Sequence, residues 1–315
     1  MVLILSFKPK IRPRRQEHYR WMREGTPNFD DRVFKHLKEL EVLAKRNVKY
    51  VYTTTPIIKA IEEMASSHRS LLVLSAGKFA GLITAMSIVN YLGGGELYSI
   101  VEKRHGYNLY TALRDEPVES IMVKNPVYVY VDEGISEALS RMVLYGAGIL
   151  PVLTRSSEVY GILTEHDFVS YLAGLVAFGA KVRDYMSRPV VVIPTGSSLK
   201  KALETMTYHG YRRLPVVEDS VVIGIITAVD VVRFFNPPGI FERSISGDIR
   251  EVLEITVDEI MSKDLATVHS EDDLVVAVKT MLSKDVSSVL VVDEHGVLEG
   301  ILTERDVLYA ILAPK

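Results

Sequence analysis

Four segments of this chain share one pattern: a glycine and two aliphatic residues are followed by a threonine and, three positions later, by a polar residue. The pattern is clearest from Gly224 to Asp230, and it recurs at Gly81 to Ser87, Gly161 to Asp167 and Gly300 to Asp306. Each segment starts as an apolar run typical of a buried strand and passes directly into apolar positions at helical spacing. The sequence therefore predicts the same strand-to-helix turn four times.

The elements around the turn are clearest in the third copy. An apolar run at 190–193 predicts a strand, and Ser198 begins a helical pattern that ends at Gly210. Two more strands, at 213–217 and 221–227, precede the final helix. This order of strand, helix, strand, strand and helix predicts an α+β fold in which the helices cover mainly one face of a small sheet.

The intervals between the marker glycines alternate long, short and long, which predicts that repeat one pairs with repeat two, and repeat three with repeat four. The expected repeats are 48–95, 117–175, 180–236 and 256–313. The first pair is predicted to span 48–179 and the second 180–315. We expect the four repeats to close into a disc within one chain, and the sequence leaves open a homodimer in which two chains stack.

Residues 1–47 are predicted to form a basic N-terminal arm and a lead-in helix. Lysine and arginine dominate 6–28, where three prolines interrupt any regular element, and apolar residues at 33–44 have helical spacing. The arm is read as a solvated segment packed on the protein, with contact to nucleic acid or to an acidic partner as the alternative. The other repeats have a Val-x-x-x-Met lead, which no segment before repeat one shows: Val118 to Met122, Val182 to Met186 and Val257 to Met261.

Composition places the chain among globular proteins with sizeable cores. Of its 315 residues 48% are apolar and 24% charged, the net charge is −3, and there is no cysteine. Without cysteine there is no disulfide, thiolate metal site or thiol nucleophile, and a cytoplasmic location is expected. The opening apolar residues 1–5 are too few to cross a membrane, so no membrane contact is predicted.

No catalytic signature stands out. The histidines lack metal-ligand spacing, and no Gly-x-Ser-x-Gly is present. The run Gly93 to Gly95 is read as a linker, since no Gly-Lys-Ser or Gly-Lys-Thr follows it. We therefore expect no catalytic residue and no metal, and a protein that is not an enzyme.

Taken together, the Val-x-x-x-Met lead, the Leu-Pro-Val-Val strand at 214–217 and the Gly-Ile-Ile-Thr-x-x-Asp turn resemble CBS (cystathionine-β-synthase-type) domains. The resemblance covers about residues 48–312, as two tandem pairs called Bateman modules. The plan is similar to that of the regulatory γ subunit of the AMP-activated kinase. The resemblance implies that clefts between paired repeats bind an adenosine ligand such as AMP, ADP or ATP, or S-adenosylmethionine or a derivative.

The resemblance also implies which residues hold the ligand. A threonine that contacts phosphate or ribose and an aspartate that accepts hydrogen bonds from ribose are present in three repeats: Thr227 with Asp230, Thr303 with Asp306, and Thr164 with Asp167. A capping box at the start of the helix is the alternative role of these pairs. Repeat one has Ser87 in place of the acid, so its site is expected to be empty or weak.

Adenine is expected against the first strand and the start of the second: Val191 and Tyr211 in repeat three, Ala266 in repeat four and Val127 in repeat two. Four cationic candidates could contact phosphate: Arg212, Arg213, Arg305 and His166. A surface salt bridge is the alternative for the first two. Because most of these cations lie in residues 180–312, the second pair is predicted to bind nucleotide better.

These features predict a non-catalytic regulator that senses adenine nucleotides and acts on a separate, unidentified protein. The alternative is a nucleic-acid-binding or protein-binding scaffold that uses the basic arm, with nucleotide as a modulator.

Overall fold

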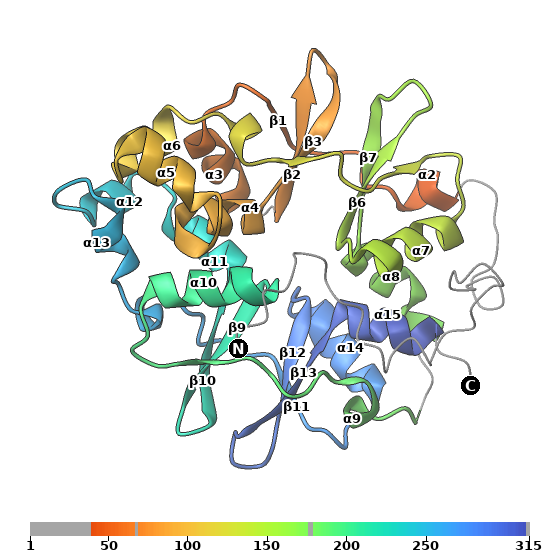
Figure 1. The fold of residues 1–315 in the computed structure, drawn as a ribbon. Helices are drawn as coiled ribbons and strands as arrows, with labels where there is room; N and C mark the ends of the chain where they lie inside the picture. Colours follow the sequence, from red (N-terminus) through yellow and green to blue (C-terminus); the bar gives the residue numbers. More distant parts are fainter. Residues whose placement is uncertain (1–38, 67–68, 176–178, 313–315) are drawn as a thin grey trace, which may run out of the picture. The chain divides into compact units, whose positions relative to one another are not determined.

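The computed structural model describes residues 39–66, 69–175 and 179–312. It contains four small sheets with their helices, one for each predicted repeat (Figure 1). Each repeat has the order strand, helix, strand, strand and helix, which confirms the predicted α+β class. The basic arm at 6–28 and the start of the predicted lead-in helix lie outside the described residues.

The elements of the first two repeats follow the predicted order closely. Repeat one comprises α2 (Glu39–Leu43), β1 (Tyr50–Tyr52), α3 (Ile57–Ala65), β2 (Ser70–Ser75), β3 (Lys78–Thr84), α4 (Ala85–Val89) and the π-helical turn η1 (Asn90–Gly94). Repeat two comprises η2 (Val118–Ser120), β4 (Val123–Lys124), β5 (Val129–Tyr130), α7 (Ile135–Tyr145), β6 (Ile149–Leu153), β7 (Val159–Thr164), α8 (Glu165–Leu172) and η3 (Ala173–Leu175).

The last two repeats have the same order. Repeat three comprises α9 (Val182–Tyr185), β8 (Ile193–Pro194), α10 (Leu199–His209), β9 (Arg213–Glu218), β10 (Val221–Thr227) and α11 (Ala228–Phe234). Repeat four comprises η4 (Val257–Glu259), β11 (Thr267–Val268), α14 (Leu274–Ser283), β12 (Ser288–Val292), β13 (Leu298–Thr303) and α15 (Glu304–Leu312). The inserts add α5 (Tyr98–His105), α6 (Leu109–Arg114), α12 (Gly239–Glu242) and α13 (Ile249–Leu253).

Three strands of every sheet share one topology, and β4 adds a fourth strand to the sheet of repeat one. Apart from β4, the pairing within each repeat is the same. The first strand of each repeat pairs in parallel with the second, and the second pairs antiparallel with the third. The first strand of repeat three is shorter than predicted, because only Ile193 and Pro194 pair with β9, at Val216 and Val217.

The chain forms two compact units, and these do not coincide with the two predicted pairs of repeats. Unit one contains repeats one and three with both inserts, over 48–126 and 191–264. Unit two contains repeats two and four, over 127–190 and 265–312, together with residues 39–47, which lead into repeat one. Each unit thus combines one repeat from each predicted pair, and the pairing itself stays a prediction.

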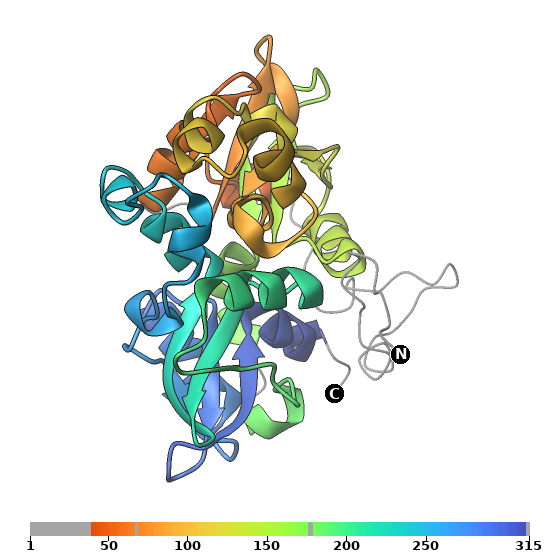
Figure 2. The same cartoon turned by 60° about the vertical axis from the view of Figure 1, so that its left-hand side comes forward.

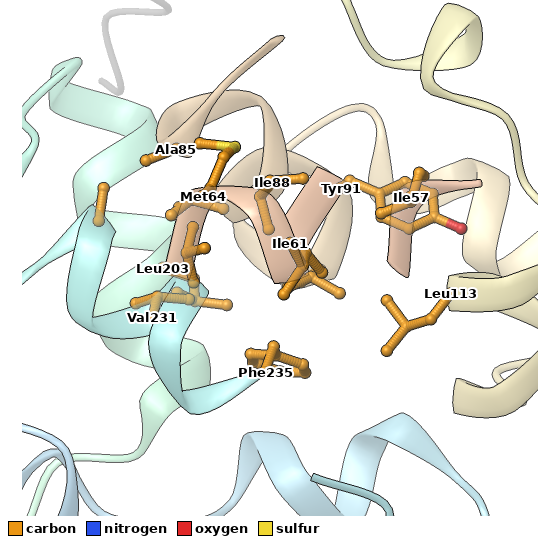
Figure 3. Close-up of a cluster of buried hydrophobic side chains, with 14 of the residues drawn as sticks. Ile57, Ile61, Met64, Ala85, Ile88, Tyr91, Leu113, Leu203, Val231 and Phe235 are labelled. Atoms are coloured by element: carbon orange, nitrogen blue, oxygen red, sulfur yellow. The ribbon is translucent and has the colours of Figure 1, made fainter. Parts of the chain in front are cut away.

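Helices of repeats one and three build the core of unit one. Figure 3 shows Ile61 and Met64 of α3 and Ile88 of α4 converging with Val231 of α11 and with Phe235, which follows that helix. All five side chains are fully buried or nearly so. Burying one such side chain stabilises the fold by roughly 1.5–3 kcal/mol, so this shared helical face accounts for much of the cohesion of the unit. Unit two is built equivalently, with α8 packed against α15.

The inserts belong to unit one. Their structure corrects the prediction that Gly93–Gly95 is a linker. They bond to each other, because the amide of Leu109 donates to the carbonyl of Gly247 and that of Ile249 to the carbonyl of Tyr107. The Gly93–Gly95 run is more than a linker, since a Cβ atom on Gly94 would lie 2.7 Å from the carbonyl oxygen of Leu203 in α10. Figure 2 shows this turn of η1 lying along α10. The glycines thus permit close packing of two helices.

Lead-in segments cross the marker glycines of other repeats. Ser262 exchanges two backbone hydrogen bonds with Ile225 of β10, and Ser187 does so with Ile301 of β13. In the same way β4 pairs with β3, and Lys45 pairs with Ile162 of β7. A Cβ atom on Gly81 would lie 2.5 Å from the carbonyl oxygen of Val123, and one on Gly161 would lie 2.7 Å from that of Lys45. At Gly81 and Gly161 the marker residue is therefore glycine because another backbone lies against it.

Repeat one has a lead after all. Leu40 is fully buried and Ala44 nearly so, at the positions that valine and methionine occupy in the other leads. A Cβ atom on Gly161 would lie 3.1 Å from the Cβ atom of Ala44. In the same way Met186 packs against Gly300 and Met261 against Gly224. The sequence search missed this lead because alanine replaces the methionine.

We expect Gly81→Ala to destabilise the protein by about 1–3 kcal/mol, the usual cost of forcing atoms into a packed interior. Gly134→Ala is the control, because a Cβ atom there meets nothing within 4 Å and φ is −84°. Urea unfolding of both variants measures the difference. Equal midpoints for the two variants would contradict the close-approach explanation.

A buried carboxylate, that of Glu116, links the end of the first insert to α5. Glu116 accepts from Arg104 at 2.7 Å and lies 2.8 Å from His105 Nε2. Burial alone would raise the pKa of Glu116, but hydrogen bonds from Ser120 and His105 outweigh it and hold the pKa below its ordinary value. The positive charge of Arg104 acts in the same direction.

Ionised Glu116 should stabilise the folded state above about pH 4.3, the ordinary pKa of glutamate, and less as the pH falls through its lower folded pKa. Glu116→Gln is expected to be less stable than the wild type at neutral pH, with the gap narrowing below about pH 4. Urea unfolding across this pH range tests it, and a gap that does not change with pH would count against the assignment.

Candidate functional site

The predicted threonine and aspartate pairs form capping boxes in all three repeats. In repeat three Thr227 Oγ1 lies 2.6 Å from Asp230 Oδ2, the Thr227 amide donates to the same oxygen at 2.8 Å, and the Asp230 amide donates to Thr227 Oγ1 at 3.2 Å. Thr303 with Asp306 and Thr164 with Asp167 repeat the arrangement. The capping role weighed from the sequence is confirmed, and it uses only one oxygen of each carboxylate.

Repeat one makes the same cap without an acid. Thr84 and Ser87 form a reciprocal capping box, in which the Ser87 amide donates to Thr84 Oγ1 at 3.1 Å. A serine hydroxyl therefore suffices to cap this turn. Capping alone does not explain why the other three repeats carry aspartate.

The second carboxylate oxygen has different surroundings in repeats two and three. Asp167 Oδ1 lies 2.7 Å from Lys45 Nζ, whereas Asp230 Oδ1 lies 3.7 Å from Arg233 Nη1, beyond hydrogen-bond distance. Asp306 is 3% exposed. Lys45 was not among the predicted site residues. It comes close to Asp167 because its backbone pairs with Ile162 of β7, which is far away in the sequence.

Arg212 and Arg213 lie beside the turn of repeat three. Arg213 is the register partner of Thr227, and the carbonyl of Arg212 accepts from the amide of Ala228 at 2.9 Å. The same backbone bond recurs in every repeat, with Gly148 and Ser287 at the position of Arg212 in repeats two and four. Sheet register thus sets the backbone of these arginines beside the start of the Thr227 and Asp230 turn.

The other two predicted cations are engaged by carboxylates in unit two. Arg305 Nε lies 2.5 Å from Glu165 Oε1, and His166 Nδ1 lies 2.6 Å from Glu304 Oε1. Arg305 also donates to the carbonyl of Gly146 at 2.8 Å. The two acids are 7% and 2% exposed, so each buried charge faces a cationic or titratable partner from the other helix. Sequence reasoning missed both acids, because only the packing of α8 on α15 brings them opposite the cations.

The predicted adenine contacts lie at the edges of the cores. Val191 and Val127 are half-buried against the cores of units one and two, and Ala266 is 9% exposed. Tyr211 is 37% exposed, and its ring stacks on His209 with centroids 5.5 Å apart. These positions leave the adenine assignment a prediction.

One pocket of about 170 Å³ lies elsewhere in unit one, between the inserts and α10. It is lined by Tyr98, Tyr107, Lys200, Arg250, Leu253 and Glu254. No predicted site residue is among them.

Two kinds of feature are absent from the residues that the structure describes. No three histidine, aspartate or glutamate side chains there cluster as metal ligands would. No helix in the described ranges has the length and apolar character needed to cross a membrane.

The comparisons with known proteins agree with this architecture. The family model of the CBS domain matches residues 37–94, 118–174, 182–236 and 257–313. The uncharacterized protein MJ1225 of Methanocaldococcus jannaschii is 32% identical over 275 residues, which is 86% of this chain and 98% of that protein. An uncharacterized 33.4 kDa protein of the Thermofilum pendens ribosomal RNA operon is 32% identical over 75% of this chain and 78% of its own length.

Solved structures give the same result. The crystal structure of MJ1225, described as that of a proposed archaeal homologue of g-AMPK, superposes with a TM-score of 0.81 over 85% of this chain and 97% of its own. An uncharacterized conserved protein of Pyrococcus horikoshii shares the fold, with a TM-score of 0.54 and 18% identity over 86% of this chain and 98% of its own. With four matched copies covering most of its length, this chain belongs to the CBS-domain family.

Proposed function

We propose that this chain is a non-catalytic regulatory protein that binds an adenosine ligand, such as AMP, ADP or ATP, in the clefts between paired CBS repeats. The observation that carries the proposal is that each aspartate uses only one of its two carboxylate oxygens to cap its helix. One oxygen caps the helix, while Ser87 shows that the cap needs no acid. A carboxylate kept in three repeats is therefore suited to a second task, and accepting hydrogen bonds from ribose hydroxyls is the one that the CBS resemblance implies.

The exchange of lead-in segments supports the pairing on which the clefts depend. The lead of repeat four pairs with the last strand of repeat three, and the lead of repeat three with that of repeat four. Repeats one and two exchange leads in the same way. This reciprocal exchange supports the predicted pairing of repeat one with repeat two and of repeat three with repeat four.

Repeat three is the strongest candidate for an occupied site. Arg212 and Arg213 neighbour its turn through sheet register, and arginine is well suited to phosphate oxygens. This supports residues 180–312 as the better nucleotide binder. Ligand binding between two repeats can favour one arrangement of the repeats over another and so alter a surface that a separate regulated protein recognises.

Calorimetry with AMP, ADP, ATP and S-adenosylmethionine tests the proposal. We expect Asp230→Asn and Asp306→Asn to lose about 1–3 kcal/mol of binding free energy at each occupied site, because a charged acceptor is removed while the amide oxygen can still cap the helix. Asp132→Asn is the control, since that exposed residue pairs with Arg155 in unit two. The proposal fails if the wild type binds none of the four compounds, or if both variants bind as the control does.

A further inference from the structure

We infer that the pocket of about 170 Å³ in unit one is a binding site for a small zwitterion, a free amino acid with an apolar side chain. The pocket is formed by α10 and by residues of both inserts, on or next to α5 and α13 (Figure 1). It shares no residue with the Thr–Asp turns. The inference therefore goes beyond the proposed adenosine site and is tested separately from it.

One wall of the pocket is aromatic and is held in place by its neighbours. The carbonyl of Tyr107 accepts from the amide of Ile249 at 2.9 Å, and the Tyr107 hydroxyl donates to Glu102 at 2.7 Å. The Cζ atom of Arg250 lies 4.3 Å from the centroid of the Tyr107 ring, and Arg250 is itself bound by both carboxylate oxygens of Asp248. Tyr107 and Arg250 are therefore already partnered, and they supply a fixed flat surface against which an apolar group can pack.

The buried part of the lining is apolar apart from one hydroxyl. Leu253 is 1% exposed, and the half-buried ring of Tyr98 lies 6.0 Å from the ring of Tyr107. Within the part of the chain that the structure describes, the Tyr98 hydroxyl has no hydrogen-bond partner. Burial raises the pKa of Tyr98 to about 12, so the hydroxyl stays protonated at neutral pH and can donate to a ligand.

Two opposite charges lie on the exposed side of the pocket, Lys200 on α10 and Glu254 just after α13. The amide of Leu199 donates to the carbonyl of Ile255 at 2.7 Å, so each charged residue is next to the same backbone hydrogen bond. Across residues 39–66, 69–175 and 179–312, neither side chain forms an ion pair or a hydrogen bond, with each other or with any other residue. A cation and an anion that are held near each other without pairing suit a ligand that carries both charges.

Size and charge together select the class of ligand. Pockets for cofactors and drug-sized ligands measure roughly 300–1,000 Å³. The smaller volume of about 170 Å³ favours a molecule smaller than a nucleotide. The carboxylate of a free amino acid can bind Lys200 and its ammonium group can bind Glu254, while an apolar side chain packs on Leu253 and the tyrosine rings. A ligand with a single charge would leave one of the two charged residues without a partner.

Calorimetry on the full chain with L-phenylalanine and L-leucine as probes tests the site. We expect at least one of the two to bind. Its analogue without the ammonium group, 3-phenylpropionate or 4-methylpentanoate, should bind about tenfold more weakly, because one charged hydrogen bond is lost. The analogue without the carboxylate, phenethylamine or isoamylamine, should show a similar loss. Lys200→Met and Glu254→Gln should each weaken binding of the amino acid about tenfold for the same reason.

Lys201→Met and Glu204→Gln are the matched controls, because these exposed residues of α10 do not line the pocket. Both controls should bind the amino acid as the wild type does. The inference is overturned if neither amino acid binds, if Lys200→Met and Glu254→Gln bind as the controls do, or if a single-charge analogue binds as tightly as its amino acid. AMP binding should be the same in Lys200→Met as in the wild type, and its loss there would contradict a separate site.

Discussion

The close approach of a lead-in segment to the marker glycine of another repeat is the constraint on which the rest of the structure depends. At Gly81 and Gly161 the nearest atom of that segment is a backbone carbonyl oxygen, and at Gly224 and Gly300 it is the sulfur of Met261 and of Met186. A side chain at the glycine would push the lead-in segment off the sheet and remove the two hydrogen bonds of the bridge. The glycine therefore fixes where each lead lies, and the lead fixes which residue faces the turn that follows.

The two units meet the same packing problem with different chemistry. The two residues after the turn threonine are Ala85 and Met86 in repeat one and Ala228 and Val229 in repeat three, all packed into one apolar core. In unit two they are Glu165 and His166 facing Glu304 and Arg305. An apolar interface is insensitive to the charge of its surroundings, whereas buried carboxylates need their partners in place. Unit two therefore has charged and polar side chains at the helix interface where unit one has apolar ones.

The capping boxes link the fold to the proposed function through a single side chain. Each aspartate holds the start of its helix with one oxygen, so the carboxylate is oriented before any ligand arrives. An acceptor that is already positioned loses little conformational freedom on binding. The surroundings of the other oxygen, with Lys45 near Asp167 and Arg233 farther from Asp230, then differ between otherwise similar turns.

The sequence by itself determined the repeat count, the order of elements and the capped turn, because these depend on local apolar periodicity and on residues three positions apart. It also singled out Arg212 and Arg213 through the family resemblance, and the register of one hairpin in the structure sets Arg213 opposite Thr227. Only the tertiary structure decided that helices of repeats one and three share a core, that Glu165 and Glu304 contact Arg305 and His166, and that Lys45 contacts Asp167. Those contacts join residues more than a hundred positions apart, and local spacing carries no information about which distant backbone a glycine will admit.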